Sequence, residues 1–211
     1  MKAVRCKYFY SHLTPITKYP LIFAYIYAII VKIITNTIMG VIMNNSIPTE
    51  TERKFLISFP DIAFLEGMGE CRKTDIVQTY LLCENGSMRV RKASENNEVR
   101  YIRNIKKRIS DMSHLEDERE ISSETYEELL LCRDAERSDI IKTRFSFPFK
   151  GYIMEIDVYP FWQDRAVLEV ELECEDEKFD VPDFLKIIKE VTYDKRYSNK
   201  ALSKEIVYEE L

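Results

Sequence analysis

Charged residues stand at every second position through much of this chain, and within each such segment nearly all carry the same sign. Residues two apart share one face of a β-strand. An antiparallel sheet with one wet face mixes the two signs, because like charges beside each other destabilise it. The sorted charges therefore predict strands whose charged face is neutralised by strongly charged ligands. Seven segments show the pattern: Glu50, Glu52 and Lys54; Arg89 and Arg91; Asn104 and Lys106; Glu116, Glu118 and Glu120; Lys142 and Arg144; Glu155 and Asp157; Glu169, Glu171 and Glu173.

The residue types in these segments indicate phosphate and a hard cation as ligands. Arg and Lys bind phosphate oxygens, and one guanidinium can bind two of them at once. Carboxylates gathered without histidine suit Mg²⁺ or Mn²⁺. The chain has two histidines, His12 and His114, and no serine or cysteine in a nucleophile-elbow motif, so an enzyme of this sequence works through carboxylates, Lys, Arg and Tyr. Its five cysteines are odd in number and form no CxxC pair, which favours reduced thiols in a cytoplasmic protein.

The apolar faces of the same strands need burial, and few helices are available to cover them. Helices are predicted over residues 123–133, capped by Ser122 or Ser123, over residues 184–190 after Pro182, and from Ser198 through Tyr208, with a shorter piece over residues 61–67. Eight strands with three or four peripheral helices predict an α+β, mainly β fold: an eight-stranded antiparallel closed β-barrel with a charged interior.

The composition changes sharply near residue 44, which predicts an apolar leader over residues 1–43 and one domain over residues 44–211. The leader holds five Lys and Arg and no acid; the remainder carries 26 Lys and Arg against 36 Asp and Glu, a net charge of −10. A domain with this excess of negative charge is a poor non-specific binder of nucleic acid.

Three explanations compete for the leader: a membrane anchor, a secretory signal, or a translation start that truly lies at Met39 or Met43. Membrane contact is expected only through residues 20–43, where the apolar run reaches the length of about 20 residues that a span needs. No cleavage site of the signal-peptide type follows it. Four basic residues precede the apolar run. If the run spanned a membrane, the positive-inside rule would keep these residues in the cytoplasm and place the acidic domain on the outer side. A cytoplasmic protein is expected, membrane-anchored if residues 20–43 insert.

The segment Glu50-Thr-Glu52-Arg-Lys54 resembles the ExExK signature of the CYTH superfamily, the triphosphate tunnel metalloenzymes. The resemblance extends over residues 49–202, with matches in order at residues 78–81, 88–91, 101–106, 116–121, 142–144, 155–157, 168–171 and 190–199. One departure is visible, because Asn104 stands where the family often has Thr, and Asn can still donate a hydrogen bond.

The resemblance implies an eight-stranded tunnel that holds a triphosphate, with a divalent metal, Mg²⁺ or Mn²⁺, on its acidic residues. It implies phosphate binding by Lys54, Arg89, Arg91, Lys106, Lys142 and Arg144, of which Lys54, Lys106, Arg89 and Arg91 are the candidate catalytic cations. It implies metal ligands among Glu50, Glu52, Glu116, Glu118, Glu155, Asp157, Glu169 and Glu171, with Glu169 and Glu171 foremost. Tyr80 is expected either to orient Lys106 or the substrate, or to line the barrel. Arg196 is expected either to reach the phosphates or to form an ion pair at a helix end.

The function expected from this resemblance is metal-dependent hydrolysis of a triphosphate, most simply inorganic tripolyphosphate, because no nucleoside-recognition motif is visible. The alternatives are an adenylate cyclase of class IV type, a thiamine triphosphatase, and a polyphosphate-binding module without activity. Thiamine recognition needs an aromatic platform, and Trp162 lies far from the second predicted strand. Pure binding would be weakened by uncompensated carboxylates. The partner is a small triphosphate, and the protein is expected to be a monomer or homodimer.

Overall fold

The computed structural model describes residues 49–83, 87–108 and 113–210, with side chains for residues 51–83, 87–106 and 117–210. These residues fall within a compact unit of residues 46–211. The predicted leader and the boundary at residue 44 lie outside the described residues. Within the described part, no helix combines the length and the apolar character that crossing a membrane requires.

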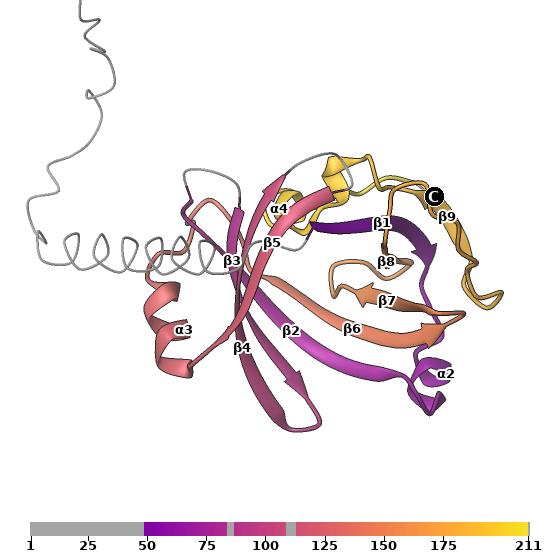
Figure 1. Ribbon diagram of the computed structural model, residues 1–211, viewed down its shortest axis with the longest axis horizontal. Coiled ribbons are helices and arrows are strands. Elements are labelled where there is room, and N and C mark those ends of the chain that lie inside the picture. The colour runs from indigo at the N-terminus through magenta and orange to yellow at the C-terminus, as the bar shows by residue number, and fades with distance from the viewer. Residues whose placement is uncertain (1–48, 84–86, 109–112, 211) are drawn as a thin grey trace, which may run out of the picture. The chain divides into compact units, whose positions relative to one another are not determined.

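The described residues form an antiparallel sheet of nine strands with short helices at its margins (Figure 1). The strand order is β5-β4-β3-β2-β6-β7-β8-β1-β9. The strands are β1 (Thr49–Ser58), β2 (Arg72–Leu81), β3 (Ser87–Glu95), β4 (Glu98–Arg108), β5 (Ser113–Ile121), β6 (Ile140–Phe149), β7 (Tyr152–Val158), β8 (Arg165–Leu172) and β9 (Ile187–Glu190). The helices are α2 (Ile62–Gly67), α3 (Ser123–Leu130), the 3₁₀ turn η1 (Lys195–Tyr197) and α4 (Asn199–Leu202).

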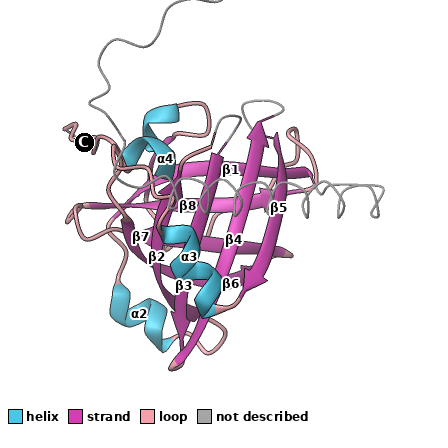
Figure 2. Cartoon of the chain, turned by 90° about the vertical axis from the view of Figure 1, so that its left-hand side faces the viewer, coloured by secondary structure: helices cyan, strands magenta, loops and turns pink. Residues whose placement is uncertain are grey.

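The sheet is strongly curved, so that β4 and β5 cross in front of β1 and β8 in Figure 2. The first residues of β1 also pair with β5, through Thr49 with Leu115, Glu50 with His114 and Thr51 with Ser113. The predicted mainly β, antiparallel fold with few helices is confirmed. The described strands number nine rather than eight, and the contact between β1 and β5 spans three described residue pairs, so a fully hydrogen-bonded closed barrel stays a prediction.

The predicted helix over residues 184–190 is wrong, because the end of this segment is strand β9. Its backbone pairs with the free edge of β1, and the β-branched side chains of Ile187 and Ile188 suit that pairing. The last predicted helix is also too long, since α4 ends at Leu202. Helices α2 and α3 agree with the sequence, and the side chains of Asp61 and Ser122 cap them by accepting backbone hydrogen bonds.

Alternation along the strands separates an apolar outer face from a charged inner face. On β1, Phe55 and Ile57 belong to an outer core with residues of β6, β7 and β8, over which Leu65 of α2 and Leu185 pack. Lys54 lies on the opposite face from Phe55. The inner face becomes apolar toward Leu56, where a second cluster gathers Ile140, Tyr159, Trp162, Val167, Tyr197 and Leu202.

The C-terminal residues after α4 are held by side chains rather than by regular structure. The indole Nε1 of Trp162 donates to the carbonyl of Val207 at 3.0 Å, and Arg165 donates to the carbonyl of Glu209 at 2.8 Å. Trp162 is 2% exposed and packs against Tyr159, Phe161 and Tyr197. Trp162 therefore packs in the second core cluster.

Candidate active site

The inner charged faces enclose a cavity of about 530 Å³. Its walls come from eight of the described strands, β1 to β8, and from the segment that runs from residue 191 into α4. The predicted site residues that line it are Glu52, Lys54, Tyr80, Arg89, Arg91, Lys106, Glu118, Arg144, Glu155, Glu169 and Glu171. The cavity therefore gathers cations and carboxylates from segments that lie far apart in the sequence.

The pairing of β1 with β8 sets opposite charges side by side. Lys54 lies directly across from Glu169 in the register. The Nζ of Lys54 contacts Glu169 Oε1 at 2.5 Å and Glu52 Oε1 at 3.2 Å. Burial lowers the pKa of Lys54, but the carboxylates of Glu169 and Glu52 outweigh burial and hold this pKa above its ordinary value. Lys54 thus stays charged, and it neutralises two carboxylates of the predicted metal set.

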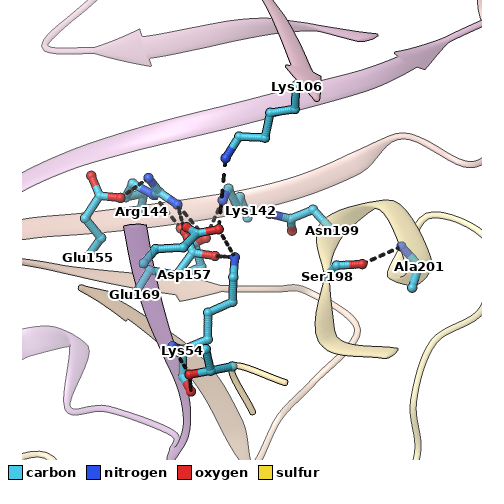
Figure 3. A network of polar contacts seen from close by, with 12 residues as sticks. Lys54, Lys106, Lys142, Arg144, Glu155, Asp157, Glu169, Ser198, Asn199 and Ala201 are labelled. Atoms are coloured by element: carbon cyan, nitrogen blue, oxygen red, sulfur yellow. Dashed lines mark hydrogen bonds and ion pairs between the residues drawn. The ribbon is translucent and has the colours of Figure 1, made fainter. Parts of the chain in front are cut away.

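Arg144 joins three carboxylates of β7 and β8 into one network, drawn in Figure 3. Its Nε and one terminal nitrogen contact the two oxygens of Asp157 at 2.7 and 2.8 Å. The same terminal nitrogen contacts Glu169 at 2.6 Å, and the other contacts Glu155. This bidentate geometry is the strong form of an ion pair. Arg144 therefore fixes the acidic wall as well as contributing positive charge to the cavity.

Lys142 and Asp157 lie behind the cavity wall rather than on it. Both side chains are almost fully buried, at 1% and 0% exposed, and the Lys142 ammonium contacts the Asp157 carboxylate. Burial and the neighbouring charge of Arg144 lower the pKa of Lys142 to about 8, although Asp157 acts in the opposite direction. Neither residue is among those that line the cavity, so the structure does not bring Lys142 to the predicted phosphate position.

A second network joins β2, β3, β4 and β5 on another wall. Arg91 donates from Nε to the amide oxygen of Gln78 at 3.1 Å, and Gln78 donates to the hydroxyl of Tyr80 at 3.0 Å. Arg91 also contacts Glu118 at 3.4 Å, and Asn104 donates to Glu118 at 3.0 Å. Burial and the like charge of Arg89 lower the pKa of Arg91 to about 10.

Gln78 has a place in the site that sequence reasoning did not assign. It is fully buried and links Arg91 to Tyr80. Gln78 stands two residues before Tyr80 and therefore shares its strand face, which is the sequence feature that indicates a place in the site. Tyr80 is buried on the cavity wall, and burial raises the pKa of its hydroxyl while Arg89 acts to lower it. The Tyr80 hydroxyl thus accepts a hydrogen bond from Gln78 of β2 and lies beside the Arg89 side chain of β3.

The segment after β9 adds cavity residues that sequence reasoning missed. Lys195, Ser198, Asn199 and Lys200 line the cavity together with residues 191–194. Asp194 caps η1 and Ser198 caps α4, and these two caps turn the chain across the site. Such caps are visible in a sequence, but the side of the sheet on which they lie is not.

Arg196, which was expected either to reach the phosphates or to form an ion pair at a helix end, is not among the residues that line the cavity. Its side chain is 60% exposed and contacts Asp194 at 2.6 Å. Consecutive residues of a 3₁₀ turn point in different directions, so Lys195 lines the cavity while Arg196 does not. This is the helix-end ion pair that the sequence offered as the alternative.

Two predicted metal ligands, Glu50 and Glu116, have side chains outside the described part of the chain. Their backbones are described, and Glu50 pairs with His114 while Glu116 pairs with Lys106. Both positions therefore fall on strands that border the charged interior.

The acidic residues have the right donor chemistry for a hard divalent cation. Glu52, Glu169 and Glu171 line the cavity from the adjacent strands β1 and β8, and their oxygens are the ligands that such ions prefer. Among the described residues, no three acidic, His or Cys side chains are arranged around one point that could hold a metal. The carboxylates of Glu52 and Glu169 instead contact Lys54, and Glu169 also contacts Arg144.

The fold and the site define a β-sheet protein with an internal cavity for a multiply charged anion. No family model matches the chain. Over 160 residues it is 34% identical to an inorganic triphosphatase of Nitrosomonas europaea, covering 74% of this chain and 97% of that protein. This relationship shows that the chain belongs to the CYTH superfamily of triphosphate tunnel enzymes.

Solved structures of similar proteins were also found. One, described as the inorganic triphosphatase NE1496, is 31% identical, with 74% of this chain and 95% of that chain covered and a TM-score of 0.46. Another, described as the hypothetical protein NE1496, is also 31% identical, with 75% and 99% covered and a TM-score of 0.47.

Proposed function

We propose that this chain is a metal-dependent triphosphatase that hydrolyses inorganic tripolyphosphate. The observation that carries the proposal is the cavity of about 530 Å³, in which Lys54, Arg89, Arg91, Lys106 and Arg144 face inward beside carboxylates. The activity named for the relative from Nitrosomonas europaea supports hydrolysis of a triphosphate over cyclisation of ATP.

The inward-facing cations would hold the phosphate oxygens. Transfer of a terminal phosphoryl group places charge on its three equatorial oxygens. Ammonium and guanidinium groups that are already in position stabilise this charge without reorganising. Arg144 and Lys54 are held by carboxylates before any substrate arrives, and Arg91 is held by Gln78. Lys142, placed behind the wall, would act by holding Asp157 and would not touch phosphate.

A divalent cation, Mg²⁺ or Mn²⁺, would be held by Glu52, Glu169 and Glu171, with Glu50 and Glu116 as further ligands. When bound, such an ion neutralises phosphate charge and lowers the pKa of a coordinated water. Arg144 would hold the carboxylates of Glu155, Asp157 and Glu169 in place, and its charge helps to hold the pKa of Asp157 and of Glu169 below the ordinary value.

The remaining expectations belong to the same proposal. We propose that β1 and β5 close the sheet into a tunnel around the substrate. We also propose a cytoplasmic location and a monomeric or homodimeric state.

The test is a panel of three substrates against three metal conditions with the products identified. The substrates are tripolyphosphate, ATP and thiamine triphosphate, each with Mg²⁺, with Mn²⁺ and with excess chelator. We expect phosphate and pyrophosphate from tripolyphosphate in the presence of metal and no turnover with chelator. Undiminished turnover with chelator would overturn the metal requirement, and cyclic AMP as the main product from ATP would establish the cyclase instead.

A further inference from the structure

Arg137 lies between the cavity wall and the segment that crosses the cavity, in the turn between α3 and β6. Its guanidinium lies over the ring of Tyr80, 5.8 Å from the ring centroid. It contacts Asp134 at 3.0 Å, and the backbone of Asp134 donates to the carbonyl of Tyr80 at 2.9 Å. One side of Arg137 is therefore fixed to the strand that carries Tyr80.

The other side of Arg137 holds α4. One terminal nitrogen donates to the carbonyl oxygen of Lys200 and to the hydroxyl of Ser203 at 3.3 Å. The Ser203 hydroxyl donates to the same Lys200 carbonyl at 2.8 Å, and the backbone of Ser138 donates to the carbonyl of Ser203 at 2.7 Å. The residue whose carbonyl is held, Lys200, itself lines the cavity.

The rest of α4 is anchored independently of Arg137. The Tyr159 hydroxyl donates to Asn199 at 2.7 Å, and Leu202 is buried in the second core cluster. Figure 3 shows Ser198 and Asn199 on this segment beside the charged network. Loss of the Arg137 side chain is thus expected to release the Lys200 end of α4 and leave the fold standing.

We infer that Arg137 is a positioning residue for triphosphate binding, acting through Lys200. The inference rests on the proposed function, because it assigns Lys200 to the substrate. Arg137 supplies a planar fork of donors that reaches an acidic side chain and a carbonyl at once, which Lys cannot reproduce. It also joins two walls of the cavity, Tyr80 on β2 and Lys200 on α4, that have no covalent connection nearby.

The experiment is a double-mutant cycle on the full chain with KM and kcat for tripolyphosphate as readouts. Arg137→Ala is expected to raise KM about tenfold with a smaller change in kcat, since hydrogen bonds from a charged group are lost. In the Lys200→Ala background the same change is expected to raise KM about threefold or less, because the group that Arg137 positions is gone. Equal factors in the two backgrounds would indicate a merely structural role and overturn the inference.

Arg133→Ala is the matched control. Arg133 lies in the same turn, contacts Asp139 at 2.9 Å and is about half exposed. We expect its KM to stay within about twofold of wild type, as for other surface substitutions. If Arg137→Ala behaves like Arg133→Ala, the inference is wrong.

Two further arms keep the result decisive. If Arg137→Ala does not fold, Arg137→Lys replaces it in the cycle, and a wild-type KM for Arg137→Lys overturns the inference. If the wild-type protein binds tripolyphosphate without hydrolysing it, the proposed function fails alone, and the same cycle is read from dissociation constants by calorimetry. If it does not bind tripolyphosphate, both fail.

Discussion

Replacing Lys142 with Met should change how the stability of the protein depends on pH. Lys142 is buried beside Asp157, but Arg144 already occupies both oxygens of that carboxylate. Burial and Arg144 therefore lower the pKa of Lys142 to about 8 from its ordinary value of 10.5. The protonated side chain is less favourable in the folded protein than in the unfolded chain.

The sign of the effect follows from proton binding. Between these two pKa values the unfolded chain binds more protons, so the free energy of unfolding rises with pH across that window. The cost of burying the charge is fully present below about pH 8 and fades as the pH approaches 10.5. The difference in pKa corresponds to about 3 kcal/mol in total, of which about 2 kcal/mol is recovered between about pH 8 and pH 10.

The assay is urea unfolding of wild-type protein and Lys142→Met at about pH 8 and about pH 10. Subtracting the variant removes the groups that titrate equally in both proteins. We expect the wild type to gain about 2 kcal/mol relative to Lys142→Met between the two conditions. A difference that stays constant, or that moves the other way, would refute the reasoning and place the proton of Lys142 in a favourable ion pair.

Four other changes test separate parts of the structure. Asp157→Asn should cost about 3 to 5 kcal/mol in unfolding free energy, since it leaves Lys142 and Arg144 buried without their shared partner; a thermal midpoint equal to that of wild type would contradict this. Arg89→Ala should lower kcat/KM for tripolyphosphate by about a hundredfold, because it removes a cation that lines the cavity. Arg53→Ala removes an ion pair with Glu190 on the outer face and should leave kcat/KM within about twofold. Equal losses in the two variants would show that the total positive charge of the protein, and not the position of Arg89, determines kcat/KM. Glu171→Gln should reduce turnover at limiting metal and recover at high metal, and full activity at limiting metal would remove it from the metal ligands. A chain beginning at Met43 should be folded and at least as active as the full chain, measured by circular dichroism and phosphate release, and loss of either property would make the leader a structural element.

The faces of the strands could be predicted from the sequence because alternation is a local property. Lys54 and Glu169 were assigned to one interior from their strand positions alone, and they are in contact in the structure. The partners within that interior could not be predicted, because which side chains meet depends on register between strands far apart in the chain. Arg144, a candidate for phosphate, contacts three carboxylates for this reason.

The C-terminal part of the chain was harder to predict for a related reason. The segment 184–190 has a proline before it and an apolar pattern that suits a helix, yet Ile187 to Glu190 pairs with the free edge of β1. An available strand edge is a property of the whole sheet, and tertiary pairing overrides local propensity. Lys195 and Lys200 could not be predicted as cavity residues for the same reason. Whether they line the cavity depends on where η1 and α4 pack against the sheet.

The packing of Trp162 gives the protein a built-in optical reporter. Trp162 is the single tryptophan of the chain. Fluorescence excited at the long-wavelength edge of tryptophan absorption, where tyrosine does not absorb, therefore reports on the surroundings of this one indole. That indole touches Tyr197 of η1 and the carbonyl of Val207, on either side of the segment that carries Lys200. Movement of this segment on ligand binding would change the polarity around the indole and shift its emission. Stopped-flow fluorescence of the unlabelled protein can therefore time the docking of the C-terminal segment separately from phosphate release.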